Sequence, residues 1–207
     1  PITEGYGLTE TSPVVCSNQV DAVQYGTVGR PLPDTECKVV DENGNSLPSG
    51  EAGELCIRGP QVMKGYWQRP EATAEVIDSE GWFKSGDMAV IAADGYIKIV
   101  DRKKDMINVS GFKVYPNEVE DILASHPDII EAAVIGIPDK EGSETVKAFV
   151  VCSNPDLDIK AVREFAKTKL TAYKVPHQIE FCKDLPKTNV GKILRRELRD
   201  KEIAKKA

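Results

Sequence analysis

The length, composition and charge of the chain indicate a soluble protein and argue against several other classes. Its 207 residues are 41% hydrophobic and 29% charged, which leaves room for one large domain or two small ones. No stretch approaches the roughly 18 apolar residues of a membrane span. Residues 1–101 hold 7 basic and 16 acidic residues, whereas residues 102–207 hold 20 and 17, so the net charge of −6 is uneven. This predicts two units of different character and argues against a nucleic-acid partner.

The cysteines and histidines argue against a disulfide framework and against a zinc site. The five cysteines are widely spaced and odd in number, and none forms a C-x-x-C pair. Neither of the two histidines has a cysteine or histidine partner at ligand spacing. This pattern favours a reducing cytoplasm, and the N-terminal residues show no signal peptide.

The opening stretch GYGLTETSP, residues 5–13, has the residue types of a ligand-binding loop. Glycines permit close backbone approach, Tyr6 offers a flat ring, Thr9 a hydroxyl, and Glu10 a carboxylate suited to Mg²⁺. No third glycine and no preceding strand complete a dinucleotide fingerprint. Taken alone, the stretch is explained as well by a plain surface turn.

The rest of the first half is predicted to form short strands and turns. The apolar runs Glu36–Val40 and Glu54–Ile57 are separated by the turn-forming sequence DENGNSLPSG. The sequence MAVIAADGYIKIV predicts a hairpin around Asp94-Gly95. Frequent proline and glycine favour strands and loops over long helices.

Two polar residues follow in this half, and a charged run ends it. Asp87, at the start of a strand in KSGDMAV, can accept two hydrogen bonds from a vicinal diol such as a ribose. Arg102 has a planar guanidinium group that can donate several hydrogen bonds to a sugar or a phosphate. Taken singly, each is better explained as a turn or surface residue.

The run DRKKD, residues 101–105, is predicted to be a linker, because composition and secondary structure both change there.

The second half predicts a small α+β domain with the element order β-β-α-β-β-α-β-α. The sequence MINVSGFKVY predicts a hairpin with Ser110-Gly111 at its turn. The helix PNEVEDILASH is predicted to begin at Pro116. The strands IIEAAVIGI and TVKAFVV precede the amphipathic helix LDIKAVREFAKTKL, which Asp158 can cap. A strand near Ile179–Phe181 and the basic helix KILRRELRDKEIAKK complete the domain.

Lys192 is the candidate anion-binding residue of the second half. It follows Gly191 in what is predicted to be the first turn of the basic helix, where a lysine beside a flexible glycine can reach an anion. The stretch is not a Walker A loop, because Ile193 stands where that motif needs Ser or Thr. Alone, it is better explained as part of a basic surface helix.

Five stretches taken together resemble the acyl-adenylate-forming enzymes, which include acyl-CoA synthetases, peptide-synthetase adenylation domains and luciferases. They follow the family's order and approximate spacing over essentially the whole chain: GYGLTETSP, GELCIRGPQVMKGYWQRPEATAE, GWFKSGDMA, YIKIVDRKKDMINVSGFKVYPNEVE and PKTNVGKILRREL. Within the superfamily, VDRKKDMINVSGFKVYPNEVED and LTAYKVPHQIEFCKDLPKTNVGKILRRELRD are most similar to bacterial long-chain fatty-acid–CoA ligases.

This resemblance implies a two-step reaction with ATP and coenzyme A as substrates and Mg²⁺ as cofactor. A fatty-acid carboxylate attacks the α-phosphate of ATP, giving acyl-adenylate and pyrophosphate, and the coenzyme A thiol then displaces AMP. The resemblance also implies a role for each candidate residue: Tyr6 and the backbone of Glu4 and Gly5 would contact adenine, Thr9 the α-phosphate, and Glu10 Mg²⁺. Asp87 and Arg102 would bind the ribose, and Lys192 the reacting carboxylate and phosphate. Lys104 would be the hinge residue, and Ser110, Gly111 and Phe112 would form the coenzyme A tunnel.

The resemblance further implies two domains joined by a hinge near residues 101–105. Residues 1–101 correspond to the β-rich end of a larger N-terminal domain, and residues 102–207 to a mobile C-terminal domain whose rotation removes Lys192 before the thiol arrives. The family's phosphate loop and most of its acyl pocket have no counterpart here, so we expect the 207-residue chain to be the C-terminal part of a ligase and inactive alone. Asn108 stands where some relatives carry a lysine, and receives no role.

Two other functions remain open at this point. One is an acyl-AMP ligase or adenylation domain that passes its product to a carrier protein, and the other is a non-catalytic nucleotide-binding module. A fatty-acid substrate would also agree with peripheral contact at the inner face of a membrane, although no amphipathic anchor stands out. The sequence defines neither the acyl chain length nor the oligomeric state.

Overall fold

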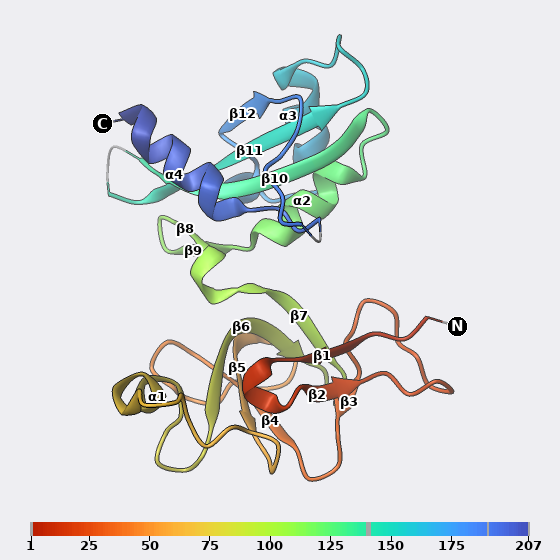
Figure 1. The fold of residues 1–207 in the computed structure, drawn as a ribbon. Helices are drawn as coiled ribbons and strands as arrows, with labels where there is room; N and C mark the ends of the chain where they lie inside the picture. The colour runs from red at the N-terminus through yellow and green to blue at the C-terminus, as the bar shows by residue number, and fades with distance from the viewer. Residues whose placement is uncertain (1, 140–141, 190, 207) are drawn as a thin grey trace. The chain divides into compact units, whose positions relative to one another are not determined.

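The computed structural model describes residues 2–139, 142–189 and 191–206 (Figure 1). The chain divides into two compact units, the first ending at Lys103 and the second beginning at Lys104. This division falls inside the charged run, two residues later than expected, because strand β7 (Ile97–Arg102) continues to Arg102. With 22% helix and 34% strand, the predicted α+β class is confirmed. No helix in the described part of the chain is long and apolar enough to cross a membrane.

The first unit is built from two antiparallel sheets. One sheet contains β1 (Gly5–Gly7), β2 (Val14–Ser17) and β3 (Arg30–Pro31). The other has the order β4 (Glu36–Val40), β5 (Ala52–Arg58), β6 (Phe83–Ile91) and β7. Both predicted apolar runs are therefore strands, and the predicted hairpin joins β6 to β7 with Ile91 opposite Ile97.

The core of the first unit lies between these strands. Its buried members come from five strands and include Val15 of β2, Val39 of β4, Leu55 and Ile57 of β5, Phe83 of β6 and Ile97 of β7. The short helices η1 (Thr9–Thr11) and α1 (Pro70–Val76) complete the unit. Helix α1 was not predicted. It has only seven residues and none is fully buried, although Val76 packs against the core, so it is too short to show a helical apolar pattern.

The second unit has the predicted element order (Figure 1). Its three-stranded sheet pairs β10 (Ile129–Pro138) antiparallel to β11 (Glu144–Cys152), which in turn is parallel to β12 (Gln178–Phe181). A separate hairpin precedes this sheet and consists of β8 (Ile107–Val109) and β9 (Phe112–Val114). The described part of the unit also contains the α-helices α2 (Pro116–Ala124), α3 (Ile159–Lys167) and α4 (Arg195–Lys206) and the 3-10 helix η3 (Ala172–Lys174). Asp158 caps α3 as predicted, since its Oδ1 accepts a 2.7 Å hydrogen bond from the Ala161 amide.

Two cores cover the two faces of this sheet, which explains why β10 is apolar at every position from Ala132 to Ile137. Val134 faces α2 and α3, whereas Ala133 and Ile135 face Leu198 of α4. Successive side chains of a strand point to opposite faces, so a strand that is covered on both sides needs apolar residues at every position. Helix α4 thus lies on the sheet face opposite α2 and α3.

Candidate functional site

Three residues that were assigned to the nucleotide meet in the first unit. The Tyr6 hydroxyl on β1 donates a 2.5 Å hydrogen bond to Asp87 Oδ2 on β6, and Asp87 lies directly opposite Arg102 on β7. Burial, and then the hydrogen bond to Asp87, raises the pKa of Tyr6, so its hydroxyl remains a donor. The cluster presents a carboxylate beside a guanidinium, which is suited to a sugar diol next to a phosphate.

The loop that follows β1 is held by close backbone packing. A Cβ atom on Gly7 would lie 1.7 Å from the Pro13 carbonyl oxygen, so only glycine fits there. The buried Thr11 hydroxyl accepts a 3.0 Å hydrogen bond from the Leu8 amide and lies 3.0 Å from the Pro13 carbonyl oxygen. Because both ends of the loop are tied, the intervening η1 turn presents Thr9 in a defined position, with its side chain exposed.

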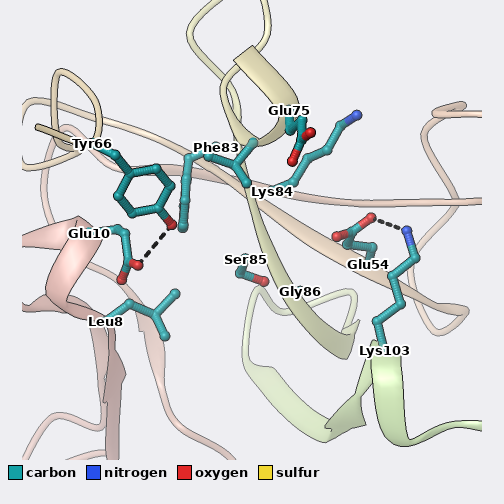
Figure 2. Close-up of a pocket in the computed structure, with 11 residues that line it drawn as sticks. Leu8, Glu10, Glu54, Tyr66, Glu75, Phe83, Lys84, Ser85, Gly86 and Lys103 are labelled. Carbon is teal, nitrogen blue, oxygen red and sulfur yellow. Dashed lines mark hydrogen bonds and ion pairs between the residues drawn. The ribbon is translucent and has the colours of Figure 1, made fainter. Parts of the chain in front are cut away.

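Glu10, the predicted Mg²⁺ ligand, is held by a segment that sequence reasoning did not assign to the site. The Tyr66 hydroxyl donates a 3.0 Å hydrogen bond to Glu10 Oε1 (Figure 2). The Met63 amide also donates to the Glu10 carbonyl oxygen at 2.8 Å. Burial and then the Glu10 carboxylate raise the pKa of Tyr66. Tyr66 belongs to one of the quoted motifs, but nothing in the sequence indicates that it contacts a residue 56 positions away.

A cavity of about 390 Å³ in the first unit lies beside this pair. Carboxylates of Glu10, Glu54 and Glu75 and ammonium groups of Lys84 and Lys103 line it (Figure 2). The cavity therefore carries both signs of charge and suits a polar ligand. Ser85 and Gly86, which immediately precede Asp87, also line it, so the cavity lies next to the Tyr6–Asp87 pair.

The donor set fits a metal ion that is shared with a ligand, and does not fit a site made by protein alone. No group of three or more His, Cys, Asp or Glu side chains among residues 2–139, 142–189 and 191–206 could hold a metal ion. Glu10 offers a single carboxylate beside an open cavity. Mg²⁺ commonly takes one or two carboxylates, with substrate phosphates and water as its other ligands. Glu10 is consistent with that role.

The predicted coenzyme A residues form the tight turn of the β8–β9 hairpin in the second unit. Ser110 and Gly111 have φ angles of 49° and 90°, and Val109 pairs with Phe112 across this two-residue turn, as expected from the sequence. The Phe112 side chain is 57% exposed and stacks on Tyr173, with a ring-centroid distance of 4.8 Å. The turn thus presents an exposed aromatic surface.

Lys192 lies before helix α4, not in its first turn, so that prediction was wrong. Residues Lys187 and Ile193 form a β-bridge, and the Thr188 amide donates to the Lys192 carbonyl oxygen at 2.8 Å. Gly191 has a φ of 81°, outside the helical region, and α4 begins only at Arg195. Within the described residues, the exposed Lys192 side chain makes no hydrogen bond or ion pair.

The predicted site residues therefore fall into two groups, one in each unit. The first unit carries the candidates for the nucleotide and the metal, from Glu4 to Arg102. Glu4 itself precedes β1, and its carboxylate accepts a 3.1 Å hydrogen bond from the Gly26 amide. The second unit carries Lys104, the Ser110–Phe112 turn and Lys192.

Solved structures define the class of protein to which this fold belongs. The chain matches ATP-bound MatB from Rhodopseudomonas palustris with a TM-score of 0.90 and 37% identity, over 97% of this chain and 40% of that one. It matches o-succinylbenzoate CoA synthetase from Bacillus subtilis, in complex with its acyl-adenylate intermediate, with a TM-score of 0.86 and 32% identity, over 97% and 41%. The fold is thus that of adenylate-forming enzymes.

The family follows from the sequence comparisons. The model of the AMP-binding enzyme family matches residues 1–67, and the model of the AMP-binding enzyme C-terminal domain matches residues 118–192. The chain belongs to the AMP-binding enzyme family. It is 54% identical to the long-chain-fatty-acid–CoA ligase of Salmonella typhimurium, over 99% of this chain, and 46% identical to that of Bacillus subtilis, over 97%. It spans 36% of the length of either relative.

Proposed function

We propose that the protein containing this chain is a long-chain fatty-acid–CoA ligase that forms an acyl-adenylate and then an acyl-CoA. One observation carries the proposal: Tyr6, Asp87 and Arg102 converge in a cluster next to Glu10, in a chain 54% identical to a ligase of that name. These residues lie far apart in the sequence, so a surface turn does not account for their meeting. A cytoplasmic location, with peripheral contact at the inner face of the membrane, agrees with such a substrate.

In the first step, a carboxylate oxygen of the fatty acid bonds to the α-phosphorus of ATP, and the bond from that phosphorus to the pyrophosphate oxygen breaks. Asp87 and Arg102 hold the ribose, and Tyr6 lies against the adenine. Thr9 donates to an α-phosphate oxygen. Lys192 offsets the negative charge that develops between the carboxylate and the phosphate, which brings two anions together. Glu10 would hold Mg²⁺, which supplies further positive charge at the phosphates.

In the second step, the coenzyme A thiolate bonds to the acyl carbonyl carbon, and AMP leaves with the electrons of the broken carbon–oxygen bond. The Ser110–Phe112 turn forms part of the thiol's path. The same volume cannot hold both Lys192 and the thiol, so the second unit turns about Lys104 between the steps. Among the residues that the structure describes, the exposed Lys192 side chain has no hydrogen-bond or ion-pair partner, which agrees with a group that enters and leaves a site.

Substitution of Lys192 by alanine in the full-length protein tests this proposal. We expect ATP–pyrophosphate exchange to fall by about a thousandfold, the loss typical of one preorganised charge-stabilising group, whereas thioester formation from pre-made acyl-adenylate persists. Lys183→Ala, at another exposed lysine of the same segment, is the matched control and should leave both rates unchanged. Unchanged exchange in Lys192→Ala would remove Lys192 from the reaction.

The choice of acceptor separates this function from its alternatives. A coenzyme A ligase turns over free coenzyme A, whereas a carrier-loading enzyme needs a pantetheinylated carrier, and a non-catalytic module shows no pyrophosphate exchange at all. We expect free coenzyme A and oleate to be substrates of the full-length protein. We expect the 207-residue chain by itself to form no oleoyl-CoA.

A further inference from the structure

Lys192 lies in a short turn whose two ends are paired. The β-bridge from Lys187 to Ile193 closes this turn. Thr188 bonds to both sides of the Lys192 backbone: its amide donates to the Lys192 carbonyl oxygen at 2.8 Å, and its hydroxyl accepts a 3.1 Å hydrogen bond from the Lys192 amide. The Lys192 backbone therefore has a defined direction relative to Lys187, although its side chain is exposed.

Apolar side chains hold the turn on the sheet of the second unit. Leu185, before the turn, is 2% exposed, and Ile193 is half-buried at its end. Both pack in the core that contains Ile135 of β10 and Phe149 of β11. Because hydrophobic contact is non-directional, these residues fix the distance of the turn from the sheet better than they fix its rotation.

An ion pair supplies the direction that the apolar contacts lack. Lys187 Nζ lies 2.7 Å from Glu131 Oε2 on β10 and 3.2 Å from Asp184 Oδ1. Glu131 lies on the same face of β10 as Ala133 and Ile135, whose core also contains Ile193. The hydrogen bond to Glu131 raises the pKa of Lys187, so this lysine stays charged. Glu131 therefore ties the base of the turn to the sheet.

We propose that Glu131 and Lys187 are positioning residues for Lys192, and that their ion pair sets the direction in which the turn presents the Lys192 ammonium group. This inference rests on the role of Lys192 proposed above, and it adds two residues that do not contact the substrates. The two side chains are 33% and 30% exposed, and a pair of this kind adds little to stability. Its loss should leave the unit folded and displace the turn.

The test compares the two half-reactions in the full-length protein. A misplacement of about 1 Å can cost a hundredfold in rate, and the apolar anchors limit the displacement, so we expect Glu131→Gln and Lys187→Met each to lower the maximal rate of ATP–pyrophosphate exchange about tenfold. The KM for ATP and the rate of thioester formation from pre-made acyl-adenylate should keep their wild-type values. Equal losses in both half-reactions would mean that the pair only stabilises the fold, and would refute the proposal.

Two further variants separate position from charge. Lys201→Met is the matched control, because it breaks an exposed 2.8 Å pair with Glu197 on α4, and it should leave both half-reactions unchanged. The double variant Glu131→Lys with Lys187→Glu restores the ion pair with its charges reversed, and we expect the exchange rate to recover. Asp184 is 78% exposed and hardly opposes this reversal. An exchange rate that stays low would mean that the Lys187 charge acts on the substrates directly, which contradicts a positioning role.

A last double variant shows whether the pair acts through Lys192. Once Lys192→Ala has removed the ammonium group, nothing remains to be positioned, so Glu131→Gln should lower exchange no further. An additive loss in this background would overturn the proposal. The same set distinguishes the inference from the function on which it rests. Wild-type exchange in Lys192→Ala removes the function of that lysine, whereas exchange that is lost in Lys192→Ala and kept in Glu131→Gln and Lys187→Met removes only the positioning role.

Discussion

Substitution of Gly7 by alanine tests whether the loop that follows β1 depends on close backbone packing. The added Cβ would lie 1.7 Å from the Pro13 carbonyl oxygen, whereas at Gly5 it would lie 3.2 Å from the Cys16 carbonyl oxygen. Neither glycine has a positive φ, so the two sites differ in available space and not in backbone strain. Gly5→Ala is therefore a matched control on the same strand.

The magnitude follows from these two distances. At Gly5 the neighbour must yield by a few tenths of an ångström, and the lower entropy of the unfolded alanine chain offsets part of this cost, so we expect a change within about 1 kcal/mol. At Gly7 the backbone must separate by more than 1 Å, which overpacking data place at about 3 kcal/mol. With a urea m-value of about 1.5 kcal/mol/M for a unit of this size, the midpoint should fall by about 2 M.

Tryptophan fluorescence is the appropriate assay, because both tryptophans of the chain, Trp67 and Trp82, belong to the first unit. Urea unfolding of the 207-residue chain followed by this signal reports that unit selectively. Amide exchange of the second unit should be unchanged. If Gly7→Ala and Gly5→Ala unfold at the same urea concentration, the close packing of the loop against Pro13 is not what stabilises it.

Three further substitutions test single contacts. Tyr66→Phe removes the hydroxyl that holds Glu10. The Mg²⁺ concentration that gives half-maximal nucleotide binding by the full-length protein, measured by calorimetry, should therefore rise about fivefold. An unchanged Mg²⁺ titration would contradict this. Tyr6→Phe keeps the ring and loses the hydroxyl, and AMP affinity should fall about fivefold, with Tyr6→Ala weaker still; equal affinity of Tyr6→Phe and wild type would show that the hydroxyl is dispensable. Hydrogen bonding from Lys147, and then from Lys205, lowers the pKa of Glu180 in the folded protein below its usual 4.5. The ionised carboxylate therefore stabilises the fold fully above pH 4.5, and this stabilisation is lost as the pH falls through the lowered pKa of the folded state. Lys147→Met should therefore lower the urea midpoint of the second unit more at pH 7 than at pH 3, and an equal loss at both would argue against the ion pair.

Local signals predicted much of the second unit, because its elements follow from short stretches of sequence. The Asp158 cap, the Ser110-Gly111 turn and the apolar strand β10 each depend on residues within a few positions of one another. Lys192 was misplaced because the apolar and basic pattern continues through it, while the β-bridge from Lys187 to Ile193 holds it outside the helix. A pairing of that kind leaves no periodic trace in the sequence.

The site itself depends on contacts that no local pattern encodes. The bond from Tyr6 to Asp87 joins residues 81 positions apart, and Lys103 meets Glu54 across 49. Family resemblance assigned Tyr6 and Asp87 to the same nucleotide, but it did not indicate that they bond to each other. A carboxylate has about four acceptor positions, so the Tyr6 hydroxyl leaves enough of them for both hydroxyls of a ribose. We therefore propose that this bond orients Asp87 before the nucleotide arrives, so that Tyr6 contributes to ribose binding as well as to adenine stacking.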